Sequence, residues 1–344
     1  RAGCARERGR RTGWGQRMSL PLDVVAGWSL PNGVVDSVEP FAVSRHLALA
    51  AEQRLTGVVH AAMLAGDLEV DDPVAVGDAH RASMARSLAL EDVLLEAVSV
   101  LEHATIEFRL LKGAALAHMD ATPEQREFGD NDLLVRPDQL VEAAAAFEAV
   151  GASRVQPPLS PTWERRFAKS VTLRWRDTEL DLHRTLAPGP YGHTIDAASL
   201  FAGSNDSAIR LAGISVPTLT PEAHLVHAAV HVALGDVVPR LGNVRDTALL
   251  IGRPGLDADR VIATVVAWRV EAPFAAGVLA AADIGAEPNG IVEWARRARR
   301  TRADRRAMAS YAERDGRFRR QALASLRVLP WRDRVAYLRS LRSR

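Results

Sequence analysis

Two aspartates, Asp130 and Asp132, stand two residues apart in the segment GDNDLLV, at the start of a predicted strand. Side chains at positions i and i+2 of a strand point to the same face, so both carboxylates can turn toward one cation. Mg²⁺ suits such a pair, because it takes one or two protein carboxylates together with waters and substrate phosphate oxygens. Acid pairs at this spacing are common, so the assignment depends on the segments around the pair.

A candidate phosphate-binding turn lies upstream of this pair. The short apolar run 108–111 ends at Lys112 and Gly113, and a small-residue helix follows from Ala114. Glycine at such a turn lets backbone N–H groups approach a phosphate, and a helix N-terminus favours negative charge. Lys112 would add a compact positive charge at the same place.

A third carboxylate, Asp181, lies between two leucines on the second strand of a predicted hairpin. A charged group in that setting is costly to bury unless it meets a cation. Lys169 begins the other strand of the hairpin, so both lysines of the chain flank the proposed acidic cluster. Because the other 42 of the 44 basic residues are arginines, a lysine can mark a place that needs an ammonium group. The alternative is three surface carboxylates and a solvated lysine.

The elements that must position these residues form a small mixed core between two helical regions. Apolar residues recur at helical spacing from 41 to about 107 and again from 221 onward. The predicted core elements are strands at 108–111, 133–135, 170–176 and 179–185, with helices at 114–118 and 138–150. The predicted later helices are 221–234, 243–252, 257–271 and 291–314. The expected fold class is therefore α+β, with a small mixed β-sheet core and N- and C-terminal helical flanks.

We expect four regions along the chain. They are a disordered basic extension over 1–17, an N-terminal helical region over 18–106, the mixed core over 107–220 and a C-terminal helical region over 221–344. Residues 1–17 have no apolar period and no apolar stretch of a secretory signal, and Met18 is a candidate natural start.

Composition bounds the class of protein. With 344 residues, 47% hydrophobic and 25% charged, the chain is predicted to fold and not to be disordered. A single cysteine, Cys4, excludes an intrachain disulfide and a cysteine zinc site, and it favours a reducing, cytoplasmic location. No apolar run approaches the length of a membrane span, so no membrane association is expected.

Charge is distributed unevenly. The net charge is +2, but residues 291–344 carry +12 and residues 1–17 carry +5, which leaves an acidic middle. A basic tail of this kind is typical of nucleic-acid binding or of solvated helix faces, and the helical periodicity favours the second interpretation.

The order of LLKGAALA, REFGDNDLLV, ELDLHRTL, LTPEAHLVHAAVHVAL and LGNVRDTALLI resembles the uncharacterised nucleotidyltransferase family of the polymerase-β-like superfamily. The resemblance runs from about residue 105 to 255, and it makes 107–220 the nucleotidyltransferase core. It implies a glycine turn at Gly113, a metal-binding pair at Asp130 and Asp132, and a third catalytic and metal-binding carboxylate at Asp181. Two departures stand out: the turn is Gly-Ala, and the polar Asn131 separates the pair and needs a hydrogen-bond partner.

The resemblance also suggests residues for nucleotide binding. They are Lys112, Gly113, Ala114, Arg126, Lys169 and His183. Arg126 precedes the aspartate pair by four residues, and it either braces a triphosphate or is an ordinary loop arginine. His231 with Asp246 is expected to make an interhelical polar contact that shapes the site. We expect no zinc at His224, His227 and His231, because they lack an HExxH frame and lie among apolar residues.

The function implied is Mg²⁺-dependent transfer of a nucleoside monophosphate from an NTP to a hydroxyl-type acceptor, which is a small molecule, an RNA or a protein. The arginine-rich segment 294–306 favours an anionic acceptor such as RNA. Two alternatives remain open. One is a toxin-like enzyme that acts on tRNA, and the other is a degenerate core that binds a nucleotide or nucleic acid without catalysis. The nucleotide, the acceptor and the oligomeric state do not follow from the sequence.

Overall fold

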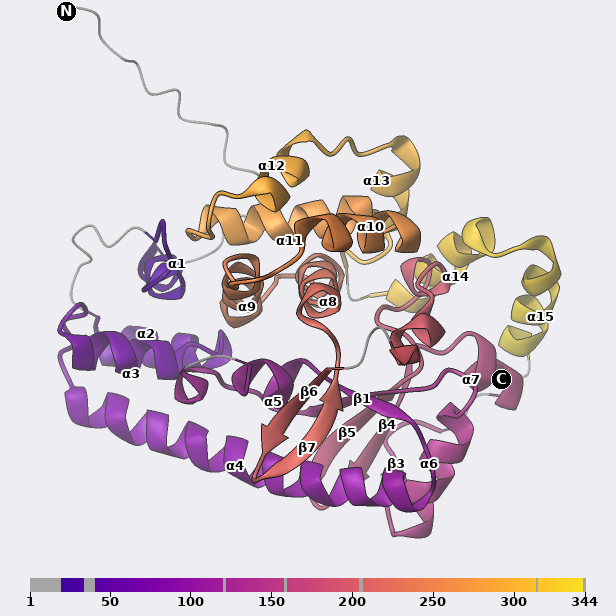
Figure 1. The fold of residues 1–344 in the computed structure, drawn as a ribbon, viewed down its shortest axis with the longest axis horizontal. Coiled ribbons are helices and arrows are strands. Elements are labelled where there is room, and N and C mark those ends of the chain that lie inside the picture. Colours follow the sequence, from indigo (N-terminus) through magenta and orange to yellow (C-terminus); the bar gives the residue numbers. More distant parts are fainter. Residues whose placement is uncertain are drawn as a thin grey trace, which may run out of the picture.

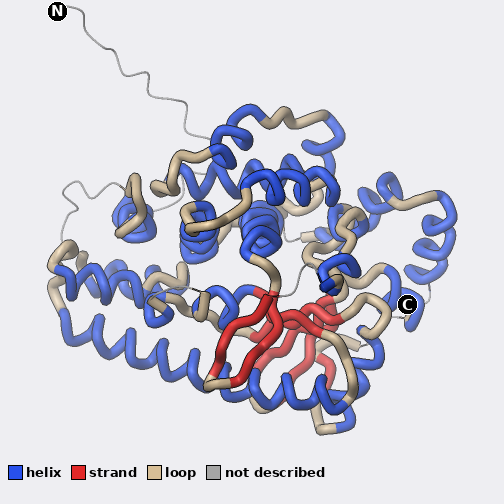
Figure 2. The backbone as a smooth tube through the Cα atoms, viewed as in Figure 1, coloured by secondary structure: helices blue, strands red, loops and turns tan. Residues whose placement is uncertain are grey.

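The computed structural model describes residues 20–33, 41–119, 122–157, 160–203, 207–313 and 315–342. The basic extension expected over 1–17 lies outside these ranges. Within them the chain forms fifteen α-helices and one seven-stranded mixed sheet, with helices before and after the sheet, so the expected α+β class is confirmed (Figures 1 and 2). None of the helices in these ranges has the length and hydropathy that crossing a membrane requires.

The sheet has the order β3-β4-β5-β2-β1-β7-β6. The strands are β1 (Phe108–Leu111), β2 (Asn131–Val135), β3 (Ser153–Arg154), β4 (Ser170–Trp175), β5 (Thr178–His183), β6 (Ser207–Leu211) and β7 (Ile214–Thr218). At the centre, β2 pairs antiparallel with β1 and parallel with β5. All five residues of β2 are buried, which agrees with a strand covered on both faces.

The predicted hairpin is formed by β4 and β5, and its turn lies one residue earlier than predicted. Arg176 and Asp177 occupy the loop with φ of 51° and 58°. Two successive left-handed residues are the geometry of the type I′ turn, whose twist matches that of the flanking strands. The hairpin register places Thr172 opposite Asp181.

The N-terminal region forms four helices, of which the last lies against one face of the sheet. They are α1 (Leu20–Gly27), α2 (Val43–Glu52), α3 (Thr56–Ala65) and α4 (Pro73–His103). The side chain of Asp72 caps α4 by accepting from the N–H of Ala75, and Pro73 fits the first helical position. Leu94 and Val98 of α4 belong to the same apolar cluster as Leu133 of β2, so α4 packs on the sheet (Figure 1).

Shorter helices join the strands, and the first of the C-terminal helices cover the opposite face. The first group is α5 (Lys112–Ala117), α6 (Leu140–Ala149) and α7 (Pro161–Arg166). The second group is α8 (Pro221–Leu234), α9 (Leu241–Ile251), α10 (Ala258–Trp268), α11 (Glu271–Asp283), α12 (Gly290–Arg297), α13 (Arg302–Ala309), α14 (Arg317–Val328) and α15 (Trp331–Arg342). One apolar cluster joins Leu111 and Leu134 of the sheet to α8–α11.

The single helix predicted over 291–314 is wrong, because the structure has two helices there. α12 ends at Arg297, and α13 starts anew with a capping box formed by Thr301 and Asp304. A capping box satisfies the free N–H groups of a new helix start, so the break is encoded locally. α14 and α15 fold back on α7, where Trp163, Phe167 and Tyr337 make ring contacts.

Buried His224 ties α8 to the sheet. Its Nε2 lies 2.8 Å from Oγ1 of Thr218, and this hydroxyl donates to the carbonyl of Leu110 at 2.7 Å. The proton of the Thr218 hydroxyl is thus used in the bond to Leu110, so His224 Nε2 must donate its own proton to the hydroxyl oxygen. Burial, with smaller contributions from Arg126 and Arg253, lowers the pKa of His224 from 6.5 to about 3.

This pKa predicts acid sensitivity. Between pH 6.5 and about 3 the unfolded chain binds a proton at this position and the folded chain does not. The free energy of unfolding should therefore fall as the pH falls, by about 1.4 kcal/mol per pH unit from this group. Denaturant unfolding at several pH values should show a slope reduced by that amount in His224→Gln. The same substitution at exposed His103 is the control, and an unchanged slope in His224→Gln would contradict the assignment.

Candidate active site

The register between β2 and β5 builds the centre of the site. Asp132 lies opposite Asp181, and Leu134 lies opposite His183. Neighbouring strands are about 5 Å apart, so the sheet itself brings together two aspartates that are distant along the chain. One ligand atom each of Asp132, Asp181 and His183 lie within 4.8 Å of one another. The structure thus joins the second residue of the predicted pair to the predicted third carboxylate.

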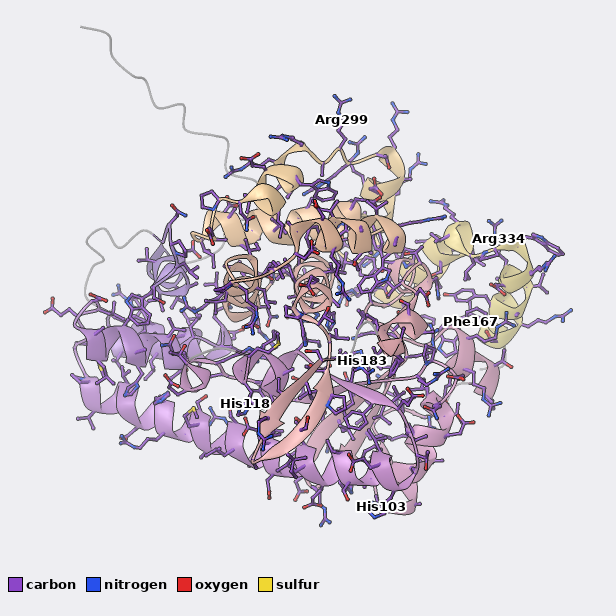
Figure 3. All side chains as sticks on the ribbon, viewed as in Figure 1. His103, His118, Phe167, His183, Arg299 and Arg334 are labelled. Atoms are coloured by element: carbon purple, nitrogen blue, oxygen red, sulfur yellow. The ribbon has the colours of Figure 1, made fainter. Side chains whose placement is uncertain are left out.

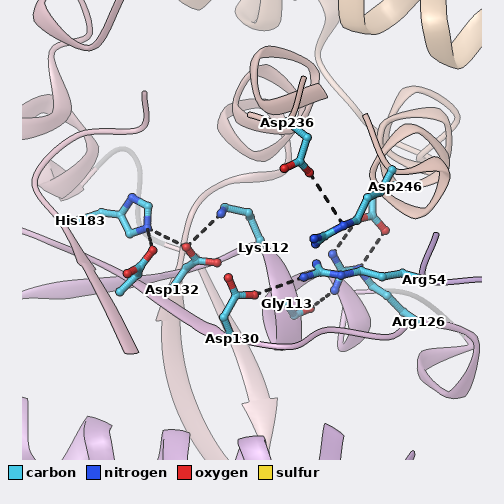
Figure 4. Close-up of polar contacts among 11 residues, drawn as sticks. Arg54, Lys112, Gly113, Arg126, Asp130, Asp132, His183, Asp236 and Asp246 are labelled. Atoms are coloured by element: carbon cyan, nitrogen blue, oxygen red, sulfur yellow. Dashed lines mark hydrogen bonds and ion pairs between the residues drawn. The ribbon is translucent and has the colours of Figure 1, made fainter. Parts of the chain in front are cut away.

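Asp132 is a buried, ionised carboxylate held by two donors. Lys112 Nζ lies 2.9 Å from its Oδ1, and His183 Nε2 lies 2.7 Å from the same atom (Figure 4). Burial alone would raise the pKa of Asp132, but Lys112 and the hydrogen bond from His183 hold it well below its usual range. Both contacts fall on Oδ1, which leaves Oδ2 outside these two hydrogen bonds.

His183 orients Asp132 as a neutral imidazole. Burial, and then the charge of Lys169, lower the pKa of His183, while its hydrogen bond to Asp132 acts in the opposite direction. Because Asp132 is ionised, the proton between the two groups must belong to His183 Nε2. An imidazole that donates in this way fixes the orientation of the carboxylate, as hydrogen-bond partners of metal ligands do.

Asp181 and Asp130 complete the acidic group from two sides. Thr172 Oγ1 donates to Asp181 Oδ1, and Asp181 Oδ2 lies 3.8 Å from His183 Nε2. Asp130 directly precedes β2, and its Oδ1 lies 3.6 Å from a terminal nitrogen of Arg54. Burial, followed by the neighbouring charge of Asp132, raises the pKa of Asp130. Asp130 therefore lies at the rim of the Asp132–Asp181 pair and not within the tightest group.

The first two residues of α5, Lys112 and Gly113, form a non-helical turn directly after β1, in the conformation that its glycine requires. Gly113 has φ of 23° and ψ of −119°, a region that L side chains rarely adopt, and Lys112 before it has φ of 40°. Leu111 is paired with Asp132, so this turn starts beside the carboxylate. The turn therefore aims the ammonium group of Lys112 at Asp132, and Ala114 is buried behind it.

Asn131, the polar residue between the two aspartates, has the partner that the sequence did not reveal. It is 2% exposed, and its Nδ2 donates to the carbonyl of Leu90 in α4 at 2.9 Å. The side chain thus points away from the carboxylates and ties β2 to α4. A buried amide with this bond avoids the cost of an unpaired polar group.

Arg126 straps the turn to α9. Its Nε and one terminal nitrogen bind both carboxylate oxygens of Asp246 at 2.8 and 2.6 Å, and its other terminal nitrogen donates to the carbonyl of Gly113 at 2.7 Å. Asp246 was expected to contact His231, whereas both of its carboxylate oxygens accept from Arg126. The strap fixes the position of Gly113 relative to the helices above the sheet.

A double-mutant cycle should measure this strap. Arg126→Ala and Asp246→Ala should each lower the free energy of unfolding by about 3 kcal/mol, because the remaining charge is left largely buried. The double substitution should cost less than the sum, with a coupling of about 1.5–3 kcal/mol in denaturant unfolding. The exposed pair Glu293 and Arg297 is the control, with an expected coupling below about 0.5 kcal/mol. Additive losses at Arg126 and Asp246 would show that the strap has no energetic role.

A cavity of about 240 Å³ opens over Asp130, Asp132 and the turn at Lys112 and Gly113. Its lining comes from the N-terminal helices, the core and the C-terminal helices, and it comprises Arg54, Lys112, Gly113, Leu116, Arg126, Asp130, Asp132, Ala228, His231, Asp236, Arg240, Asn243 and Asp246. A neighbouring cavity of about 450 Å³ shares five of these residues: Arg54, Leu116, Arg126, Asn243 and Asp246. The site therefore lies where the N-terminal helices, the sheet core and the C-terminal helices meet.

Several lining residues carry no signal in the sequence. Arg54 and Arg240 lie in no motif, Asn243 lies in LGNVRDTALLI but was not singled out there, and Arg54 is one of 42 arginines. Lys169, by contrast, lies where the sequence placed it, beside the acidic cluster. Burial, and then the charge of Lys112, lower the pKa of Lys169, while Asp132 and Asp181 act in the opposite direction. Both lysines therefore lie within the field of the same carboxylates.

The arginine-rich helices α12 and α13 are remote from this cavity. Figure 1 places them on the opposite side of α8–α11 from the sheet. In Figure 3, Arg299 lies at the outer edge of the molecule, whereas His183 lies at its centre. An acceptor bound only on these arginines would not reach the carboxylates.

The residues present fit a divalent cation that prefers oxygen ligands. Asp132 and Asp181 offer carboxylate oxygens on neighbouring strands, Asp132 is held ionised, and Asp130 and Asp132 line the cavity. Mg²⁺ takes few protein carboxylates and keeps its remaining positions for water and phosphate oxygens, as this open arrangement allows. His183 donates to Asp132 and is better suited to orienting it than to binding the ion.

Comparison with known proteins identifies a matching family model and solved structures of low similarity. A family model described as "Uncharacterised nucleotidyltransferase" matches residues 39–285. Among solved structures, the antibiotic-resistance factor ANT(2'')-Ia has 16% identity and a TM-score of 0.39, over 53% of this chain and 92% of its own. An antigenic nucleotidyltransferase-like protein from Paracoccidioides brasiliensis has 13% identity and a TM-score of 0.31, over 58% and 92%. These TM-scores are too low to carry structural detail to this chain. No curated protein matches.

Proposed function

The chain belongs to the uncharacterised nucleotidyltransferase family, and on this premise we propose that it transfers a nucleoside monophosphate from an NTP to a hydroxyl acceptor in a Mg²⁺-dependent reaction. One observation carries the proposal. The register of β2 and β5 sets Asp132 opposite Asp181, and the turn of Lys112 and Gly113 begins beside them. Carboxylates that hold a cation next to a turn that accepts phosphate are what phosphoryl transfer requires.

In the proposed reaction, the acceptor oxygen forms a bond to the α-phosphorus, and the bond from that phosphorus to the α,β-bridging oxygen breaks. Pyrophosphate leaves. Asp132 and Asp181, with Asp130 at the rim, would hold Mg²⁺, which neutralises triphosphate charge and favours the ionised acceptor. Asp181 takes the proton of the acceptor hydroxyl, and Thr172 keeps that carboxylate in place.

The other residues position these groups. Lys112 and the backbone at Gly113 would bind the β and γ phosphates of the NTP, with Lys169 adding positive charge from β4. His183 orients Asp132, and Arg126 holds the turn through the carbonyl of Gly113. The predicted role of Arg126 in bracing a triphosphate would require it to leave Asp246, so we propose a positioning role instead.

The cavities bear on the acceptor. Their volumes of about 240 and 450 Å³ are in or near the range of small-molecule sites. The remote position of α12 and α13 gives no support to an RNA acceptor bound through those helices. We therefore propose a small hydroxylated molecule as the acceptor.

Nucleotide binding is tested first, because this measurement needs no acceptor. Each NTP with Mg²⁺ is titrated while thermal unfolding is followed, and the nucleotide that stabilises the protein is then supplied with an α-phosphate label. Label should move into a pool of small hydroxylated compounds with release of pyrophosphate, and RNA and protein pools are assayed in parallel. Failure of every NTP to stabilise the protein would contradict the proposal, and label in RNA would change the acceptor class.

A further inference from the structure

Arg54 reaches the site from the N-terminal helices with its side chain largely uncommitted. It lies at the corner between α2 and α3, and it lines both cavities. Its terminal nitrogen lies 3.6 Å from Asp130 Oδ1, which is too long for a hydrogen bond. Across the described ranges this ion pair is the only polar contact recorded for the side chain, whereas Arg126 beside it uses all three nitrogens (Figure 4).

The backbone at Arg54 is strained, although a glycine would avoid the strain. Its φ is 59°, in the left-handed region that is costly for residues with a Cβ atom. The corner is held against α9: the carbonyl and Oε1 of Gln53 accept from the N–H groups of Gly242 and Leu241 at 2.9 and 3.0 Å. The fold thus keeps an arginine in a conformation that suits glycine, and its side chain faces the cavity.

The surroundings indicate what this side chain binds. Arg54 now faces Asp130, one of the carboxylates proposed to hold the cation. When that carboxylate binds a cation, the guanidinium loses its anionic neighbour and requires another. A guanidinium is suited to phosphate oxygens, which it can bind through two parallel hydrogen bonds. The cavity that it lines also holds Lys112 and Gly113, where the triphosphate is proposed to lie.

We propose that Arg54 is a polyphosphate-binding residue, which makes the N-terminal helices part of the active site. This inference rests on the proposed nucleotidyl transfer and adds to it a residue outside the sheet core. The ligand class is the β,γ end of an NTP, or free tripolyphosphate, which presents the same oxygens. Arg54 binds this end of the substrate while its backbone corner anchors α9.

The test separates the charge from the backbone strain. Calorimetric titration with tripolyphosphate and with the Mg²⁺ complex of an NTP compares wild type with Arg54→Ala, Arg54→Gly and Arg54→Lys. The Ala and Gly variants should both bind roughly 10- to 100-fold more weakly, and the Lys variant should lie between them and wild type. The Gly variant should nevertheless unfold about 2 °C above the Ala variant, because it relieves the left-handed strain.

Arg269 provides a matched control. It has φ of 56°, is exposed and ends α10. Arg269→Gly should unfold above Arg269→Ala in the same way, with the dissociation constants of both ligands unchanged. If wild type binds the Mg²⁺–NTP complex and Arg54→Ala binds it equally well, the inference about Arg54 is overturned and the proposed function stands. If wild type binds neither an NTP nor tripolyphosphate, the result contradicts the proposed function itself, and the inference about Arg54 falls with it.

Discussion

Replacement of Asp132 by Asn is expected to abolish nucleotidyl transfer, with a fall in kcat/KM of roughly 10³-fold or more. Asp132 is 3% exposed, is held ionised and is the carboxylate on which Lys112 and His183 converge. An amide keeps the shape but loses the charge that would hold Mg²⁺. Pyrophosphate release measures the reaction, and titration with Mn²⁺ followed by electron paramagnetic resonance measures the ion.

The substitution should also destabilise the fold, by about 3 kcal/mol, because Lys112 would keep its buried charge without an anion on Oδ1. Loss of activity must therefore be judged at a temperature where the variant is folded. Asp138→Asn, an exposed acid just beyond the same strand, is the control and should keep activity within about twofold. If folded Asp132→Asn keeps more than a tenth of wild-type activity, or binds Mn²⁺ as wild type does, the site is wrongly assigned.

Replacement of Lys112 by Met should make stability dependent on the metal. Its ammonium is the strongest neutralising charge on Asp132, and Asp132 in turn raises the pKa of Lys112 against the effect of burial. Without it, a buried carboxylate lacks its cation, and in EDTA the free energy of unfolding should fall by about 3–5 kcal/mol. Added Mg²⁺ should restore part of this loss, because the ion supplies the missing positive charge, while NTP binding remains weak.

Lys169→Met is the matched control for this prediction. Lys169 is the other lysine near the same carboxylates, but burial lowers its pKa and the structure records no hydrogen bond from it to an aspartate in the described ranges. Its removal should cost less, and Mg²⁺ should stabilise that variant no more than wild type. Denaturant unfolding with and without Mg²⁺ gives both quantities. An Lys112→Met protein as stable as wild type in EDTA would refute the role assigned to this lysine.

The centre of the site was predictable because its signals are local. Asp132 and Asp181 each lie in a short apolar strand pattern, and the turn at Gly113 is marked by its glycine. The hairpin of β4 and β5 followed from alternation and a polar turn, with an error of one residue. Each of these features is fixed by backbone preferences within a few residues.

The surroundings of the site depend on contacts that no local pattern encodes. Arg126 meets Asp246 across 120 positions of the chain, and many acids could have been its partner. Asn131 shows the same limit, since its need for a partner was evident and the carbonyl of Leu90 was not. β6 and β7 were not predicted, and they are short strands at one edge of the sheet that alternate between buried and exposed residues.

Three of the four regions proposed along the chain, the core and its two helical flanks, share their interior in the part of the chain that the structure describes. Leu111 and Leu134 of the core belong to one apolar cluster with α8–α11, and the corner at Arg54 contacts α9. We propose that the boundaries at 107 and 221 mark successive segments of the chain and not separately folded domains. Because the cavity walls come from both flanks, we expect that the core alone would lack a complete site.

The parallel alignment of β2 with β5 has a consequence for insertions and deletions in this chain. The gap between Asp132 and Asp181 is set by lateral hydrogen bonding, so the intervening stretch with α6 and α7 can lengthen or shorten without moving either carboxylate. A single residue inserted within β5 ahead of Asp181 is a different matter. It would invert the alternation and present a leucine where the acid belongs. We therefore expect length changes to be tolerated in the connecting loops and not within β5 ahead of Asp181.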